Sequence, residues 1–323
     1  MRAMSYLKFL AAEGRESLPI YLYLYYLSSQ LPRTTWFSLT DSPYPAHVLG
    51  HAVDIYSPYP YMPAEEGTVS QILRIPTPKY RDDAVTTDWV LIIDLGNDVV
   101  LKVLHVKPQV RVGEKVHLGD ELGDYVMSGF FPPWSEPHMH VEVRSARDPL
   151  RVRGAYKLLP TKELLDVLAS TGCASTNKFR ITYVGKSFYL ARPASGSAIC
   201  ADIGGGEYIC DCGIPHYGYG AVVGELRVNS SLDITSLRIL DYDVGAVELA
   251  EPYRLIFTPK SVPYVNGVPV RGVGTYLLRR EVKIIPSREL QQLNLSIGDE
   301  VVITFRHSAT CRVNKALRYL KKR

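Results

Sequence analysis

The sequence predicts a mainly β protein, in which an antiparallel β-sandwich is followed by a second β-rich domain with few short helices. Short runs of β-branched and aromatic residues recur along the chain, and many of them alternate with polar residues. Glycine- and proline-containing turns separate these runs, as between antiparallel strands. With 323 residues, 46% of them hydrophobic, the chain is long enough to build two domains.

Residues 1–44 are predicted to form an aromatic-rich β lead-in that packs on the domain after it. Within it, the Tyr/Leu alternation of residues 20–27 predicts a β-strand. This run is much shorter than the roughly 20 apolar residues that a membrane-spanning helix needs. We therefore expect no transmembrane segment. A turn is predicted at residues 41–45, where the lead-in ends.

Residues 45–155 are predicted to form the β-sandwich domain, with strands at residues 88–95, 99–105 and 138–144. A linker of residues 156–177 follows. It contains one short helix at residues 161–169, because apolar residues recur there at helical spacing between Pro160 and Gly172.

Residues 178–323 return to short strands and form a β-rich accessory domain, which ends in a predicted strand at residues 297–305. The basic tail at residues 315–323 is interpreted as a short solvated helix whose cations lie near its negative end. The net charge of +4 is too small to indicate a nucleic-acid partner. The oligomeric state is left open.

The amino terminus lacks the apolar core of an export signal, since residues 1–8 are followed by acidic residues. This favours a cytoplasmic location, with an extracytoplasmic one as the alternative. The five cysteines, an odd number, cannot all pair within one chain. The spacing of Cys210 and Cys212 near His216 is not that of common zinc sites. Buried free thiols or one disulfide are expected instead.

Two histidines separated by one residue, His138 and His140, carry most of the chemical information in the sequence. Side chains alternate along a strand, so both imidazoles fall on the same side and can share a small site. Two more histidines and a carboxylate, His47, His51 and Asp54, precede a strand-like segment upstream. Imidazole and carboxylate are zinc ligands, and a catalytic zinc keeps three protein ligands with one position open. A zinc site built from both stretches is predicted.

The order of these parts resembles the lysostaphin-like zinc metallopeptidases: an upstream aspartate, a lone strand histidine, glycine turns, then His-x-His-x-Glu-x-Arg. The resemblance covers roughly residues 45–150. It implies that Asp54 and His140 are zinc ligands. It also implies that His105 and His138 assist catalysis, with the division of roles left open.

The sequence departs from that family at one position, because Gly50 stands where the first histidine ligand is expected. His47 is the preferred replacement: the pattern His-x-x-Gly-x-Ala-x-Asp that starts there resembles the zinc motif of the related D-alanyl-D-alanine peptidases. His51 is the alternative. Three residues apart on an extended chain, His51 and Asp54 point to opposite faces unless a bulge intervenes.

The resemblance implies a zinc metalloendopeptidase that hydrolyses a peptide or peptidoglycan-like substrate through a metal-activated water. Glu142 has two interpretations, as the residue that orients one imidazole and as a solvent-facing strand carboxylate. A catalytically inactive lysostaphin-like binding or regulatory domain is the alternative function. Gly50 favours that alternative, whereas the presence of Asp54, His105 and the His138/His140 pair argues against it.

Overall fold

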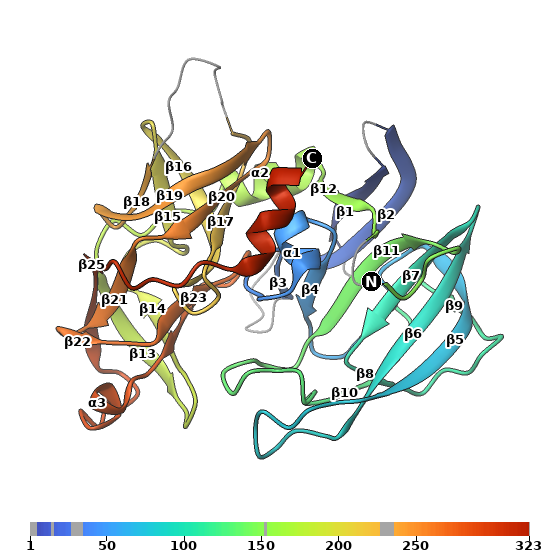
Figure 1. The fold of residues 1–323 in the computed structure, drawn as a ribbon, viewed down its shortest axis with the longest axis horizontal. Helices are drawn as coiled ribbons and strands as arrows, with labels where there is room; N and C mark the ends of the chain where they lie inside the picture. Colours follow the sequence, from blue (N-terminus) through green and yellow to red (C-terminus); the bar gives the residue numbers. More distant parts are fainter. Residues whose placement is uncertain (1–4, 14–15, 27–34, 152–153, 227–235, 323) are drawn as a thin grey trace. The chain divides into compact units, whose positions relative to one another are not determined.

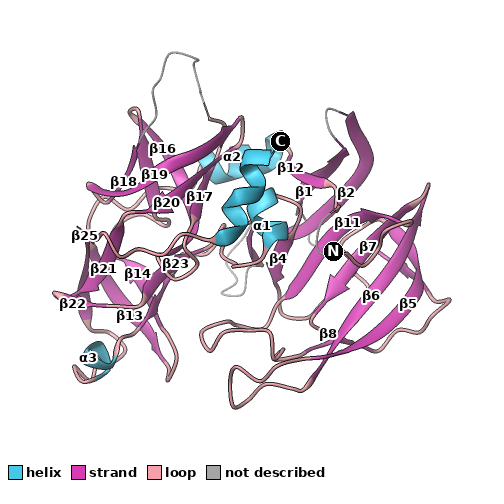
Figure 2. Cartoon of the chain, viewed as in Figure 1, coloured by secondary structure: helices cyan, strands magenta, loops and turns pink. Residues whose placement is uncertain are grey.

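The computed structural model describes residues 5–13, 16–26, 35–151, 154–226 and 236–322. Leu27 of the predicted strand, residues 1–4 of the amino-terminal segment and Arg323 of the tail lie outside this part. Strands account for 51% of the chain and helices for 8%, so the predicted mainly β class with few short helices is confirmed (Figure 2). None of the helices in the described ranges has both the length and the apolar character that a membrane crossing requires.

The contacts divide the chain into two compact units. The first contains Met1–Leu39 and Pro45–Leu164, and the second contains Thr40–Tyr44 and Leu165–Arg323. Residues 40–44, which the sequence assigned to the lead-in, therefore belong to the second unit. The boundary between the two units after Leu164 falls within the helix α2, Lys162–Ala169. This helix lies within the range predicted for the linker helix.

The first unit is built on a seven-stranded antiparallel sheet that curves into a half-barrel, with the order β3-β4-β11-β7-β6-β5-β9 (Figure 1). The predicted strands at 88–95, 99–105 and 138–144 are confirmed as β6, β7 and β11. The bounds are β3 Trp36–Ser38, β4 Val53–Tyr56, β5 Glu66–Pro76, β6 Thr87–Gly96, β7 Val99–Leu104, β9 Lys115–His117 and β11 Met139–Ser145. A separate pair is formed by β8 Val106–Pro108 and β10 Gly123–Tyr125.

A smaller sheet covers part of this half-barrel. It has the order β12-β1-β2, from Lys157–Pro160, Ser5–Glu13 and Glu16–Tyr26. Phe9 of β1 meets Phe37 of β3 edge to face, with ring centroids 5.4 Å apart. Both rings are fully buried, so the aromatic residues of the amino-terminal hairpin contribute to the core of the first unit.

The second unit is also β-rich, and its strands form one extended antiparallel sheet that includes a closed six-stranded barrel. Its strands are β13 Lys178–Val184, β14 Tyr189–Pro193, β15 Cys200–Ile203, β16 Gly206–Ile214, β17 Gly220–Val223, β18 Ser236–Ile239, β19 Tyr242–Glu251, β20 Arg254–Pro259, β21 Ser261–Val265, β22 Val268–Pro269, β23 Gly272–Thr275, β24 Val282–Ile285 and β25 Glu300–His307. The strand predicted at 297–305 thus begins at Glu300, because the residues before it form a turn.

Besides its part of α2, the described residues of this unit include α3 at Arg288–Gln291 and a 3₁₀ helix, η1, at Lys315–Lys322. The tail was expected to be a solvated helix. It is instead amphipathic, since Ala316 and Leu317 of η1 are buried.

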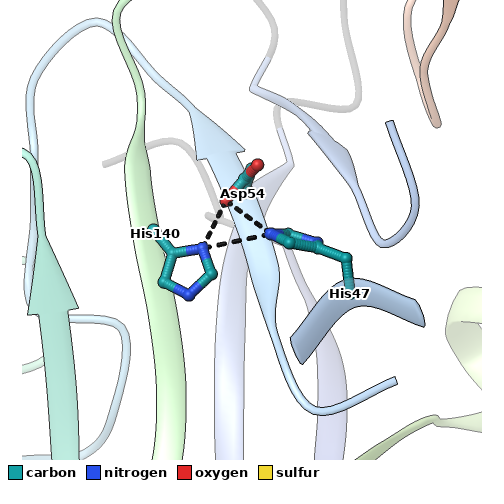
Figure 3. A group of neighbouring side chains, drawn as sticks. All are labelled: His47, Asp54 and His140. Carbon is teal, nitrogen blue, oxygen red and sulfur yellow. Dashed lines mark hydrogen bonds and ion pairs between the residues drawn. The ribbon is translucent and has the colours of Figure 1, made fainter. Parts of the chain in front are cut away.

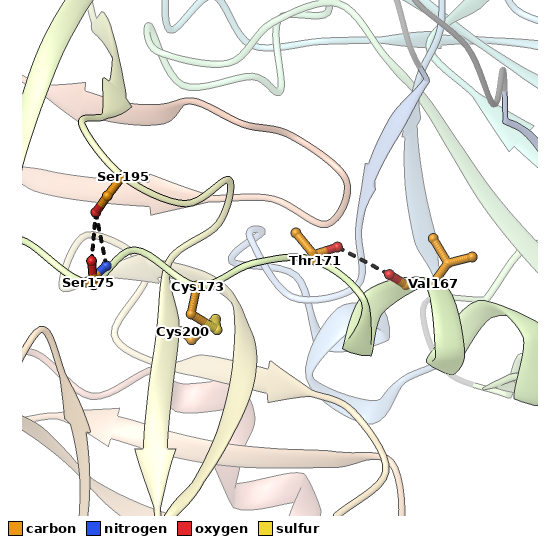
Figure 4. Close-up of a disulfide and its surroundings, with 6 residues drawn as sticks. All are labelled: Val167, Thr171, Cys173, Ser175, Ser195 and Cys200. Atoms are coloured by element: carbon orange, nitrogen blue, oxygen red, sulfur yellow. Dashed lines mark hydrogen bonds between the residues drawn. A yellow bond between two sulfur atoms is a disulfide. The ribbon is translucent and has the colours of Figure 1, made fainter.

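One disulfide joins Cys173, in the segment after α2, to Cys200 of β15 (Figure 4). Cys210 and Cys212 are buried free thiols inside the apolar core of the second unit, and Cys311 is a partly exposed thiol. The two outcomes expected for the cysteines, buried thiols and one disulfide, therefore occur together.

We predict that Cys200→Ser lowers the free energy of unfolding by about 3 kcal/mol, because the bridge closes a loop across a sequence separation of 27 residues. Chemical denaturation under non-reducing conditions measures this loss. The matched control Cys311→Ser, which removes a free thiol, should change stability by less than about 0.5 kcal/mol. Five titratable thiols in the denatured non-reduced protein, instead of three, would contradict the assignment.

Candidate metal centre

Three side chains from separate parts of the first unit meet at one point. His47 comes from the helix α1, Pro45–Leu49, Asp54 from β4 and His140 from β11 (Figure 3). Their ligand atoms all lie within 4.8 Å of one another. Asp54 Oδ1 lies 3.2 Å from His47 Nε2 and 2.8 Å from His140 Nδ1, and the two imidazole nitrogens are 3.1 Å apart. We call these three residues the ligand cluster.

The register of two neighbouring strands brings Asp54 and His140 together. In the antiparallel pair β4–β11, Asp54 is directly opposite His140. Side chains of directly opposed residues emerge on the same face of a sheet, with Cβ atoms about 4.5–5.5 Å apart. Residues 86 positions apart in the sequence thus become neighbours through backbone pairing alone.

The end of α1 places His47 and explains the glycine at position 50. Gly50 N donates to His47 O at 3.0 Å, and His51 N donates to Ala46 O at 2.8 Å. These two bonds form a Schellman motif, which ends a helix at a residue in the left-handed conformation. Gly50 has φ +74°, a value that histidine adopts only at a cost. The position expected for the first ligand is therefore a helix cap, and the histidine one turn earlier faces Asp54.

The alternative ligand, His51, is buried but does not belong to the ligand cluster found among the described residues. It follows the cap, where the chain leaves the helix for β4. The geometry therefore favours His47 as the third member.

Hydrogen bonds fix which imidazole nitrogen faces the centre. Leu39 O can only accept, so His47 Nδ1 at 2.9 Å donates to it and Nε2 is left as an acceptor. His140 Nε2 lies 3.1 Å from Glu142 Oε1 and donates to that carboxylate. His47 Nε2, Asp54 Oδ1 and His140 Nδ1 then converge on one point, and all three are acceptors once a cation replaces the proton on His140 Nδ1.

The electrostatics of the ligand cluster favour positive charge. Burial disfavours a charged ring, yet hydrogen bonds to Asp54 and Glu142 raise the pKa of His140 to about 9. Burial alone would raise the pKa of Asp54, but the surrounding His47, His138 and His140 hold it well below its usual value. Near pH 7 the His140 ring therefore carries an extra proton when no metal is bound, and a metal ion would take that proton's place. Two imidazoles and one carboxylate are ligands that suit zinc.

Glu142 is held in turn by two cations. Lys102 Nζ lies 3.0 Å from Glu142 Oε1, and Arg144 Nη1 donates to Oε2. Although burial raises the pKa of a carboxyl, His140, Lys102 and Arg144 lower that of Glu142 to about 2. Glu142 is thus a buried anion that orients His140, and the solvent-facing interpretation of this residue is wrong.

His138 lies beside the ligand cluster, with Nε2 3.6 Å from Asp54 Oδ2. Its Nδ1 donates to Glu136 O at 2.8 Å. The rings of Tyr56 and Phe131 flank it, with centroids at 4.8 Å and 4.5 Å. Burial lowers the pKa of His138 to about 4, so its ring is neutral near pH 7.

His105 stands between β7 and β8, with ring centroids 5.5 Å from His138 and 6.2 Å from His140. All four histidines of the predicted site and Asp54 are therefore neighbours. The sequence did not single out Asp88, which accepts from His105 Nδ1, or Ser128, which donates to Asp88. Neither has a diagnostic spacing to His105, so no local signal was available for them.

Comparison with known proteins adds one match. A family model described as the Domain of unknown function (DUF8155) N-terminal domain matches residues 27–160, a range that contains the ligand cluster, His105 and His138. No curated protein and no solved structure matches the chain.

We predict that Arg144→Met destabilises the protein by roughly 3–5 kcal/mol, because it leaves Glu142 with one fewer cation in a buried position. Urea unfolding followed by circular dichroism measures the change. Arg147→Met is the matched control, since Arg147 makes an ion pair with Asp98 but its side chain is 85% exposed, and its loss should cost no more than about 1 kcal/mol. Equal losses in the two variants would contradict the buried network.

Proposed function

We propose that the first unit is a zinc-dependent metallopeptidase with His47, Asp54 and His140 as the zinc ligands. The observation that carries the proposal is the convergence of three potential ligand atoms within 4.8 Å of one another. The other ring nitrogen of each imidazole is held by a hydrogen bond to Leu39 O or to Glu142. Metal-bound histidines in proteins are held in this way by carbonyl or carboxylate partners. Two further imidazoles beside the cluster supply the groups for proton transfer.

Zinc held by three protein ligands activates a water molecule near neutral pH and polarises a carbonyl group. The chain must then accept a proton and stabilise the developing negative charge. His105 and His138 are our candidates for these tasks. Neither belongs to the ligand cluster, and His138 Nε2 lies within 3.6 Å of the Asp54 carboxylate. The order of the parts along the chain, which resembles lysostaphin-like enzymes, supports a peptide or peptidoglycan-like substrate.

The inactive binding domain is the less well supported alternative. In the sequence, this alternative is favoured by Gly50, which stands where the first histidine ligand is expected. Because Gly50 caps α1 in a Schellman motif, the glycine has a structural reason to be there. Its presence therefore no longer suggests that the site has degenerated.

We expect His47→Ala to abolish stoichiometric zinc binding, because it removes one of three ligands. His51→Ala is the matched control, as it removes a buried histidine that lies outside the ligand cluster, and it should retain about one zinc per chain. Elemental analysis after dialysis against trace zinc measures both. The opposite pattern would assign the third ligand to His51, and zinc-free wild-type protein would overturn the proposal.

His138→Ala should keep its zinc and lose hydrolysis by at least about 100-fold, because a proton-transferring imidazole disappears while the ligands remain. The assay is cleavage of a panel of peptides and cross-linked peptidoglycan fragments by the zinc-loaded protein. An unchanged rate would remove His138 from the mechanism.

A further inference from the structure

Asp88, the second residue of β6, is a fully buried carboxylate that belongs neither to the ligand cluster nor to the Glu142 network. Its Oδ2 lies 2.5 Å from His105 Nδ1 and 2.5 Å from Ser128 Oγ, and its Oδ1 accepts from Trp89 N at 2.7 Å. Burial opposes ionisation, but these three hydrogen bonds hold the pKa of Asp88 below its usual value. The group is therefore an anion.

Since an ionised carboxylate can only accept, the proton of a neutral His105 ring must reside on Nδ1. The opposite edge of the ring, with Nε2, then carries an acceptor lone pair. The ring lies beside His138 and His140 in the part of the site that borders the ligand cluster.

The backbone of His105 supports this arrangement. His105 has φ +69°, a left-handed conformation that costs a non-glycine residue about 1–2 kcal/mol. Val126 N donates to His105 O at 3.1 Å. This conformation interrupts the alternation of β7, and Asp88 stabilises the side chain in the direction that results. Strain of this kind is found at sites where geometry is maintained for function.

Asp88 also positions the segment of Phe130 and Phe131 through Ser128. Ser128 Oγ accepts from Phe130 N at 3.2 Å, and Ser128 O accepts from Phe131 N at 3.0 Å. Phe131 in turn stacks on His138 at an interplanar angle of 23° and meets His105 with centroids 4.5 Å apart. The buried carboxylate of Asp88 thus positions the imidazole of His105 directly. Through Ser128 it also positions Phe131, whose ring packs on both His105 and His138.

The two imidazoles outside the ligand cluster differ in their partners. His138 is held by the neutral carbonyl of Glu136, whereas His105 is held by the Asp88 carboxylate. We infer that Asp88 is a positioning residue: together with Ser128 it holds neutral His105 as the Nδ1–H tautomer, so that Nε2 is the proton acceptor beside the ligand cluster. The catalytic part of this inference rests on the proposed function, but the tautomer does not.

The decisive variant is Asp88→Asn, because an amide cannot replace all three hydrogen bonds. Trp89 N–H requires an acceptor, which places the amide oxygen at the Oδ1 position and the amide nitrogen at the Oδ2 position. That nitrogen donates to His105 Nδ1 and forces the proton onto Nε2. Asp88→Asn should therefore exchange the tautomer of His105 with almost no change in shape.

Imidazole ¹⁵N chemical shifts of the metal-free protein measure the tautomer, with the His105 signals identified by their loss in His105→Gln. At a pH where the ring is neutral, wild type should show the proton on Nδ1 and Asp88→Asn should show it on Nε2. Asp94→Asn is the matched control. Asp94 lies on the same strand but is exposed, and the hydrogen bond that it accepts comes from Gly96 N instead of from His105 or Ser128, so the wild-type tautomer should persist.

An Nε2–H tautomer in the wild-type protein would overturn the inference, and this measurement does not depend on whether Asp88→Asn folds. Retention of the Nδ1–H tautomer in folded Asp88→Asn would overturn it as well. In the zinc-loaded protein, Asp88→Asn should keep its metal and its KM within about twofold while kcat falls on the order of 100-fold. A merely structural Asp88 would lower stability and leave kcat of the folded fraction unchanged. Absence of zinc from the wild type would refute the proposed function, while the tautomer would still test Asp88.

Discussion

The antiparallel pairing of β4 with β11 is the constraint on which the site depends. It sets Asp54 opposite His140, and a slip of one residue would turn the two side chains to opposite faces. The other edge of β11 pairs with β7, where Leu104 lies opposite His140, so that His105 follows at the end of that strand. The Schellman cap at Gly50 then joins α1 to β4 and directs His47 at the same point. Every predicted ligand or catalytic side chain is attached to this pair of strands or to the elements next to it.

Each buried charge of the site is balanced by an opposite charge or a hydrogen-bond donor beside it. Three buried carboxylates, Asp54, Asp88 and Glu142, each face histidine, and Glu142 also faces Lys102 and Arg144. An unpaired charge in such a place would cost several kcal/mol, so each group needs the others. The same partners orient the imidazoles, because a carboxylate or a carbonyl on one ring nitrogen determines what the other nitrogen can do. Stability and site geometry therefore depend on the same hydrogen bonds.

Much of this arrangement could be predicted from the sequence where local periodicity carries the information. The alternation around His138 and His140 predicts a shared face, and both rings contact the carboxylate of Asp54. Strands β6, β7 and β11 and the helix α2 follow from apolar spacing and turn residues. The roles of Asp88 and Ser128 could not be predicted, because they arise from contacts across 17 and 40 residues that no local pattern encodes. The left-handed conformation at position 105 could not be predicted either, because the residue there is histidine and not glycine or asparagine, the types that usually adopt it.

In the proposed zinc site, one cation is held jointly by three distant stretches of the first unit. Anomalous diffraction at the zinc edge, from crystals grown with stoichiometric zinc, tests it most directly. We expect a single strong peak at about 2.0–2.2 Å from His47 Nε2, an Asp54 oxygen and His140 Nδ1. A peak coordinated by His51 in place of His47 would revise one ligand. No peak at Asp54 and His140, with zinc bound elsewhere or absent, would show that these residues do not form a zinc site.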